Sequence, residues 1–237
     1  MIQIEEIQKK FGNIVAVNIQ YLKINEGEIF GLVGNNGAGK TTLLRLILDL
    51  LKPECGQILS KAIPIYQSEH WKTYTGAYID SNFLIDFLNP LEYFEFIAKI
   101  YNIPNDIMRN DLDKYNQFLN FNRFGSNKYI RQLSSGDRQK VGIIGALIPK
   151  PEILILDEPF NNLDPSSQII LKNILKSNFL DGTKLIIVSS HNLNHISEIC
   201  SRIALMEKGT IIKDLPNVRS TMDEIEDYFL NQVKFTN

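Results

Sequence analysis

Gly34-Asn35-Asn36-Gly37-Ala38-Gly39-Lys40-Thr41 is the stretch of sequence that decides the fold. It fits a phosphate-binding loop at every fixed position, which are a glycine, four free residues and then Gly-Lys-Ser/Thr. The apolar residues 28–33 before it are typical of a buried strand, and the leucine-rich residues 42–48 after it are typical of a helix. A strand, a glycine-rich turn and a helix in this order predict an α/β domain that binds the phosphates of a nucleotide.

The chemistry of this loop indicates how such a ligand is held. The glycines allow the backbone to curl so that successive N–H groups point at phosphate oxygens, and the helix N-terminus, with Thr42 in its first turn, adds a partial positive charge. We expect Lys40 to reach the outer phosphates and the hydroxyl of Thr41 to bind magnesium. The alternative is a glycine-rich turn that binds nothing, and the register of Gly39 with the next two residues argues against it.

Composition is that of an ordinary globular chain, with 237 residues, 44% hydrophobic and 22% charged. The net charge of -2 offers no basic field, so we expect no nucleic-acid partner. Cys55 and Cys200 match no metal-binding spacing and are expected to be reduced thiols. The first residues are acidic where a signal peptide would be cationic, and no run of 18 apolar residues occurs. We therefore expect a cytoplasmic protein that contacts a membrane only through another chain.

The order of patterns along the chain predicts one domain, residues 1–237, built around a mostly parallel sheet. Residues 2–24 alternate as in antiparallel strands, and residues 82–135 carry helical stripes that indicate an inserted helical subdomain. An aromatic stripe in this insert, which includes Phe83 and Phe87 at its start, is expected to be core. After the insert we expect helices over 136–147, 166–177 and 193–200, strands over 153–156 and 184–188, and a hairpin around 208–209. An amphipathic helix is expected to end the chain, with Met222, Ile225, Tyr228, Phe229 and Val233 on its apolar face.

A second group of candidate residues follows the expected strand Ile153-Leu154-Ile155-Leu156. Asp157 and Glu158 come directly after it, at the carboxyl edge where α/β sheets bind ligands. We expect Asp157 to hold magnesium, through water, and Glu158 to orient and polarise an attacking water. The alternative is that both acids only cap the next turn. The phosphate loop makes the catalytic interpretation the stronger one.

Leu133-Ser134-Ser135-Gly136-Asp137, just upstream of the acidic strand, resembles the Leu-Ser-Gly-Gly-Gln signature of the ATP-binding-cassette ATPases. Two further segments follow that family's order: Asn161-Asn162-Leu163-Asp164 resembles its loop after the acidic strand, and Ser189-Ser190-His191 resembles its switch histidine segment. The resemblance covers essentially the whole chain. It implies a P-loop nucleoside triphosphatase core with an N-terminal antiparallel β-subdomain, and ATP with Mg²⁺ as ligands.

The resemblance also implies roles for individual residues. Ser134 and Gly136 would meet a phosphate at the start of a helix, and His191 would contact the terminal phosphate and Glu158. Phe11 stands where the family places an aromatic that stacks on adenine, although a core phenylalanine is an equal rival there. Lys40, Glu158 and His191 would form the catalytic set.

Three positions depart from the family pattern. Ser135 replaces a glycine, and Asp137 replaces a glutamine and puts a negative charge close to a phosphate. Thr75-Gly76-Ala77-Tyr78-Ile79-Asp80 resembles the Ile-Gly-Ala-Leu-Ile-Glu stretch of exporter cassettes of the bacteriocin and antibiotic-peptide immunity kind. This places Asp80, a possible magnesium ligand, where the family has a Gln, and Gln67 is the alternative candidate.

The family resemblance implies a subunit that works in a pair. Two cassettes would enclose two ATP molecules, each signature motif closing over the other chain's phosphate loop, and the second cassette could be identical or different. The function this implies is ATP hydrolysis that powers a separate transmembrane permease, most simply in an exporter, at the inner face of the cell membrane. The alternative is a soluble cassette ATPase in cofactor assembly, translation or DNA repair. A nucleotide kinase or GTPase would share only the phosphate loop.

Overall fold

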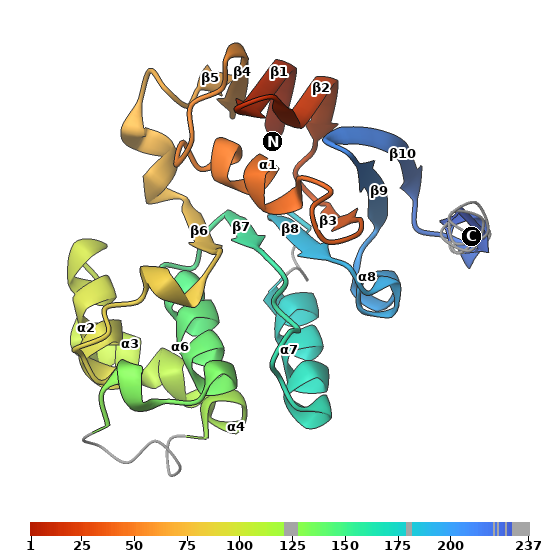
Figure 1. Cartoon of the computed structure of the whole chain (residues 1–237). Coiled ribbons are helices and arrows are strands. Elements are labelled where there is room, and N and C mark those ends of the chain that lie inside the picture. The colour runs from red at the N-terminus through yellow and green to blue at the C-terminus, as the bar shows by residue number, and fades with distance from the viewer. Residues whose placement is uncertain (121–127, 179–181, 220, 222, 226, 229–237) are drawn as a thin grey trace.

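Two β-sheets enclose α1 (Lys40–Ile47), the helix that follows the phosphate loop (Figure 1). The computed structural model describes residues 1–120, 128–178, 182–219, 221, 223–225 and 227–228. Among these residues no helix is long and apolar enough to cross a membrane.

The first sheet is antiparallel, with strand order β2-β1-β4-β5. Its strands are β1 (Ile2–Phe11), β2 (Ile14–Ile24), β4 (Cys55–Ser60) and β5 (Ile63–Pro64). The alternation over residues 2–24 predicted the first pair correctly, and the pair starts with Ile2 opposite Ile24 and shifts register between Lys9 and Lys10. The pattern after α1 gave no such signal, so β4 and β5 were not expected.

The second sheet has the order β10-β9-β3-β8-β7-β6 and is parallel except for the terminal pair β9 and β10. Its strands are β3 (Ile29–Val33), β6 (Thr75–Tyr78), β7 (Ile153–Leu156), β8 (Leu185–Ser190), β9 (Arg202–Glu207) and β10 (Thr210–Pro216). The predicted strands and hairpin are confirmed, and β6 adds an unpredicted strand at the edge. This α/β architecture is the predicted fold class.

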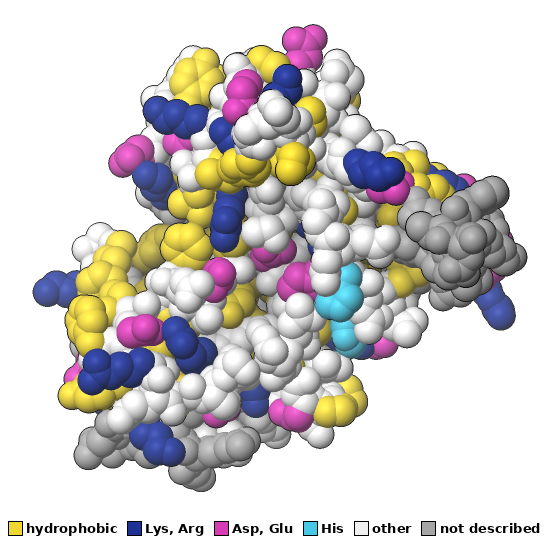
Figure 2. Space-filling model, in the orientation of Figure 1, with side chains coloured by type: hydrophobic (Ala, Val, Ile, Leu, Met, Phe, Trp, Pro, Cys, Tyr) yellow, Lys and Arg dark blue, Asp and Glu magenta, His cyan; other side chains and the backbone are white. Residues whose placement is uncertain are grey.

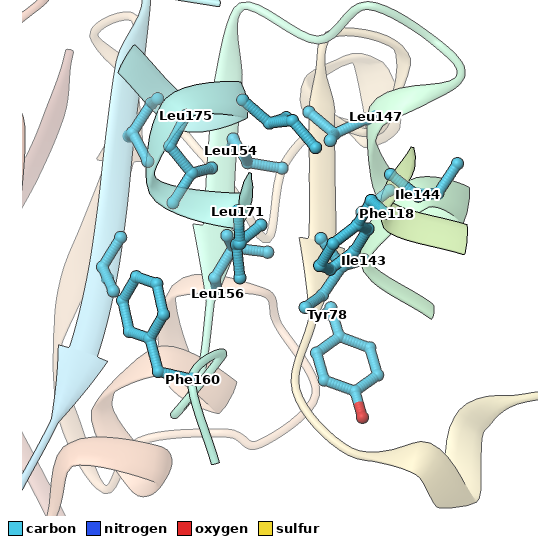
Figure 3. Close-up of a cluster of buried hydrophobic side chains, with 14 of the residues drawn as sticks. Tyr78, Phe118, Ile143, Ile144, Leu147, Leu154, Leu156, Phe160, Leu171 and Leu175 are labelled. Carbon is cyan, nitrogen blue, oxygen red and sulfur yellow. The ribbon is translucent and has the colours of Figure 1, made fainter. Parts of the chain in front are cut away.

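Alternate side chains of the central strands enter different cores. Ile153 and Ile155 of β7 pack with α1 and the antiparallel sheet, whereas Leu154 and Leu156 pack on the opposite face. That opposite face is covered by α6 (Ser135–Leu147), α7 (Pro165–Asn178) and α8 (Leu193–Ile199). Figure 3 shows part of this cluster, with Leu154, Leu156 and Leu171 meeting between sheet and helices. Because both faces are covered, the strands are continuous apolar runs.

The insert contributes α2 (Pro90–Ile100), α3 (Asn105–Asp113) and α4 (Asn116–Leu119). Short 3₁₀ turns η1 (Glu69–Thr73), η2 (Ser81–Phe83) and η3 (Ile130–Gln132) connect this region to the rest. Asn89 caps α2 and exchanges hydrogen bonds with Glu92, so the helix begins after Phe87. The expectation that Phe83 and Phe87 are buried is wrong, since their side chains are 58% and 68% exposed. They lie on the turns that precede the helix, where no neighbouring layer of the described residues covers them.

Helix α6 lies very close to β6 and thereby joins the insert to the sheet. A Cβ at Gly142 would stand 2.3 Å from the ring of Tyr78, so this approach requires glycine. Burial raises the pKa of Tyr78 to about 12. At the other end of the chain Ile225 is buried, as expected of a packing segment, and Tyr228 packs against the same core. The other three expected apolar positions, Met222, Phe229 and Val233, lie outside the described residues.

Candidate nucleotide site

The phosphate loop connects the end of β3 to the start of α1. Gly39 has a φ of 107°, which favours glycine, and its Cβ position would lie 2.3 Å from the carbonyl oxygen of Ala16. Lys40 is buried, and its ammonium donates to the carbonyl oxygens of Gly34 at 2.7 Å and Asn35 at 3.3 Å. The lysine therefore lies folded over the loop whose backbone would hold the phosphates.

Asp157 lies next to Thr41 although 116 positions separate them in the sequence. Strand β7 lies between β8 and β6 in the sheet and ends at Leu156, which brings the following acid to the start of α1. The hydroxyl of Thr41 donates to a carboxylate oxygen of Asp157 at 2.5 Å, and Ser189 donates to the other oxygen. Burial raises the pKa of Asp157, while these two hydrogen bonds lower it. A buried carboxylate beside a hydroxyl is a donor set that fits Mg²⁺.

Glu158 connects the lysine to the histidine. One carboxylate oxygen lies 3.3 Å from the Lys40 ammonium, and the other lies 3.0 Å from Nδ1 of His191. The backbone N–H of Glu158 donates to Ser189 at 2.9 Å, so the β8 serine positions both acids. Glu158 itself has a φ of 46°, in the left-handed region. Ordinary β geometry ends here, and the chain turns directly after β7.

The signature segment begins α6 on the surface. Ser134 is the N-cap of this helix, and both it and Ser135 are exposed. Gly136 faces the loop after Glu158, because a Cβ there would lie 2.5 Å from the carbonyl oxygen of Asn162. Buried Gln139 reaches the same loop and donates to the carbonyl oxygen of Pro159 at 2.6 Å. The helix start is thus held against the turn that follows Asp157 and Glu158.

Asp80 and Gln67 occupy different parts of the molecule. Tyr78, the last residue of β6, pairs with Leu156, so Asp80 follows at the same edge as the two acids of β7. Its carboxylate accepts the N–H of Asn82 at 2.9 Å. Gln67 is exposed after β5 of the other sheet and donates to the hydroxyl of Tyr66. Asp80 thus has the better position for a magnesium role, which stays a prediction.

Phe11 lies at the end of β1 and is 50% exposed, so it is not the core residue that was its alternative. The ammonium of Lys9 lies 5.5 Å from its ring centre. The other two histidines contact aromatic rings: His70 packs edge-on against Tyr74, and His195 lies against Phe160. Cys55 is exposed and Cys200 buried, and both are free thiols.

A groove of about 360 Å³ opens beside Asp80, where the insert meets the sheet. Its lining is mostly apolar and includes Trp71, Ile79, Phe83 and Tyr101. In Figure 2, histidine and acidic side chains gather in the middle of the same face, between the upper sheet region and the lower helical region. The groove and the acids therefore share one edge of the central sheet.

Sequence reasoning missed two residues of this site. Ser189 was assigned no role, although it hydrogen bonds to both Asp157 and Glu158, and Gln139 was not singled out at all. A serine directly before the expected switch segment was a usable signal for the first. The sequence gives no such signal for Gln139, because a glutamine inside a helix pattern is ordinarily a surface residue.

The sequence model of the family described as ABC transporter matches residues 17–161. The uncharacterized ABC transporter ATP-binding protein YhaQ of Bacillus subtilis (strain 168) is 33% identical over 97% of this chain and 74% of that protein. Methionine import ATP-binding protein MetN 2 of Bacillus thuringiensis subsp. konkukian (strain 97-27) is 32% identical over 98% of this chain and 72% of that protein. The dimeric post-hydrolysis structure of the ATP-binding cassette MJ0796 bound to ADP and Pi has a TM-score of 0.81 at 26% identity, covering 92% of this chain and 99% of that one.

Proposed function

This chain belongs to the ABC transporter family as an ATP-hydrolysing cassette, and from that premise we propose that it powers export through a separate transmembrane permease. The observation that carries the proposal is the meeting of Lys40, Asp157, Glu158 and His191 at one edge of the central sheet. These residues come from two strand ends, those of β7 and β8, and from the start of α1, and together they suit phosphoryl transfer to water.

Each residue has a defined task in hydrolysis. Lys40 would leave its loop carbonyls to neutralise the outer phosphates, and Thr41 with Asp157 would hold Mg²⁺. The metal would withdraw charge from the phosphate oxygens when bound. Glu158 accepts the hydrogen bond of the attacking water and is held in place by His191 at 3.0 Å. Asp80 approaches the metal site from β6, and Phe11 stacks on adenine.

A second cassette completes the site in this proposal. Ser134 is exposed and starts a helix of 13 residues, so its hydroxyl and the positive end of α6 are open to a ligand from another chain. The similarity to a dimeric cassette with ADP and Pi supports a pair in which each chain's Ser134 meets the other chain's terminal phosphate.

The groove beside Asp80 is the proposed docking site for the permease. Phe83 lines the groove, and both it and Phe87, four residues later, are exposed, which suits an apolar partner segment more than free solvent. Docking there would place the cassette at the cytoplasmic face of the membrane and pass its movement to the permease. The resemblance of residues 75–80 to exporter cassettes supports the export direction, and the similarity to methionine import proteins supports the reverse.

Two experiments test these statements. Affinity purification of the tagged chain from detergent-solubilised membranes should recover a protein of about six membrane-spanning helices, and replacement of Phe83 and Phe87 by serine should abolish its recovery. Recovery of the chain only from the soluble fraction, with no membrane protein, would contradict the proposal that it works with a permease.

The direction of transport is tested by methionine uptake. Cells that express the Lys40→Ala variant should take up methionine as fast as cells that express the parent chain, and slower uptake with the variant would show import.

A further inference from the structure

The signature hydroxyl is already engaged within its own chain. Ser134 Oγ donates to a carboxylate oxygen of Asp137 at 2.8 Å and accepts the Asp137 backbone N–H at 3.1 Å. A serine hydroxyl has a single proton to donate. Contact with a partner's terminal phosphate therefore requires that this hydrogen bond to the carboxylate be broken.

The same geometry puts two negative charges close together. A phosphate oxygen that accepts from Ser134 would lie about 2.7 Å from Oγ. The Asp137 carboxylate oxygen, 2.8 Å from the same atom, would then stand no more than about 5.5 Å from the phosphate. Asp137 is half-buried, which limits the screening of this repulsion by salt. A glutamine, the residue that the family motif has here, brings no charge.

We propose that Asp137 is a brake on closure of the ATP-bound pair: it holds the proton of Ser134 and repels the terminal phosphate that the serine must bind. This inference rests on the proposed pairing of cassettes and specifies how that pairing is regulated. Asp137 acts through Ser134 and is a positioning residue. The open form gains a hydrogen bond and the closed form gains a repulsion, and both effects weaken ATP-dependent closure.

A purely structural role for Asp137 predicts the opposite change in dimer affinity when the acid is neutralised. An acid in the first turn of α6 stabilises the helix through its dipole, so its neutralisation would loosen the signature segment. Loss of order there would weaken dimerisation. The direction of the change in dimer affinity therefore separates the two roles.

The experiment compares Asp137→Asn and Asp137→Gln in a background of Glu158→Gln, which slows hydrolysis so that the ATP-bound dimer persists. Analytical ultracentrifugation with MgATP gives the dimer dissociation constant, and a fluorescent ATP analogue gives nucleotide affinity of the monomer. Asp137→Glu keeps the charge and is the matched control. Asp106→Asn removes an exposed acid from the first turn of another helix, α3, and controls for net charge.

We expect each neutral variant to tighten the dimer about tenfold per site, and hence about a hundredfold in a symmetric pair with two such contacts. Monomer affinity for the analogue should stay within twofold, the two controls should leave the dimer unchanged, and the Tm without ATP should be equal or lower. Unchanged or weaker dimerisation of both neutral variants would overturn the brake while the pairing stands. Absence of any ATP-dependent dimer in every variant would overturn the pairing, and the brake with it.

Discussion

Replacement of Glu158 by glutamine should separate ATP binding from ATP hydrolysis. The carboxylate lies 3.3 Å from the Lys40 ammonium and 3.0 Å from Nδ1 of His191, so it connects the lysine proposed to bind phosphate with this histidine. Glutamine keeps the shape of the side chain but cannot accept a proton from water. The change therefore removes the proposed base with little disturbance of the packing.

The rate should fall because the base is lost. A positioned general base contributes about 10²–10⁴-fold, which corresponds to about 2.7–5.4 kcal/mol in the barrier. ATP affinity should rise, because the lysine no longer has to leave an anionic partner to reach phosphate. The gross attraction at 3.3 Å is about 5 kcal/mol for an effective dielectric constant of 20. Desolvation and screening cancel most of it, and a net of about 1 kcal/mol corresponds to about fivefold tighter binding.

Two assays measure these effects on the purified chain. Phosphate release under saturating MgATP reports the rate, and titration with a fluorescent ATP analogue reports affinity. Glu152→Gln is the control, since that exposed acid pairs with Lys61 at 2.5 Å on the surface. Turnover within about twofold of the parent chain, or weaker nucleotide binding, would refute the role of Glu158.

Three further predictions follow from single contacts. Asp80→Ala should lower magnesium-dependent hydrolysis by at least about tenfold while Gln67→Ala leaves it unchanged, and the reverse result in a phosphate-release assay would move the metal role to Gln67. Gly142→Ala should lower the free energy of unfolding in urea by about 1 kcal/mol, since the clash with Tyr78 at 2.3 Å outweighs the gain in helix propensity; a more stable variant would contradict this packing. Asp164→Ala should cost about 1 kcal/mol at pH 7, since the acid caps α7. Hydrogen bonds from the first turn of α7 lower the pKa of Asp164 to about 2, so the stabilisation is complete above pH 4 and the deficit should disappear between about pH 4 and pH 2 in melts; a constant deficit would argue against the cap.

Local patterns predicted much of the fold correctly. The strand Ile153–Leu156 and the helix from Pro165 matched within a residue or so, because period and turn residues are local properties. The strands β4 and β6 were missed, since each is defined by pairing with a strand distant in the sequence. Exposure of Phe87 was also missed, because helical spacing says nothing about whether a neighbouring layer covers the side chain.

The sequence by itself determined the ligand class and the family. A phosphate loop and a signature motif are short segments in which fixed residue types at fixed spacing do the binding, so they can be recognised without the fold. Only the tertiary structure decided which residues meet. It placed Asp157 against Thr41, Glu158 between Lys40 and His191, and Asp80 at the same edge of the sheet. These contacts depend on the order of parallel strands, which arises from the packing of distant segments and cannot be read from any one of them.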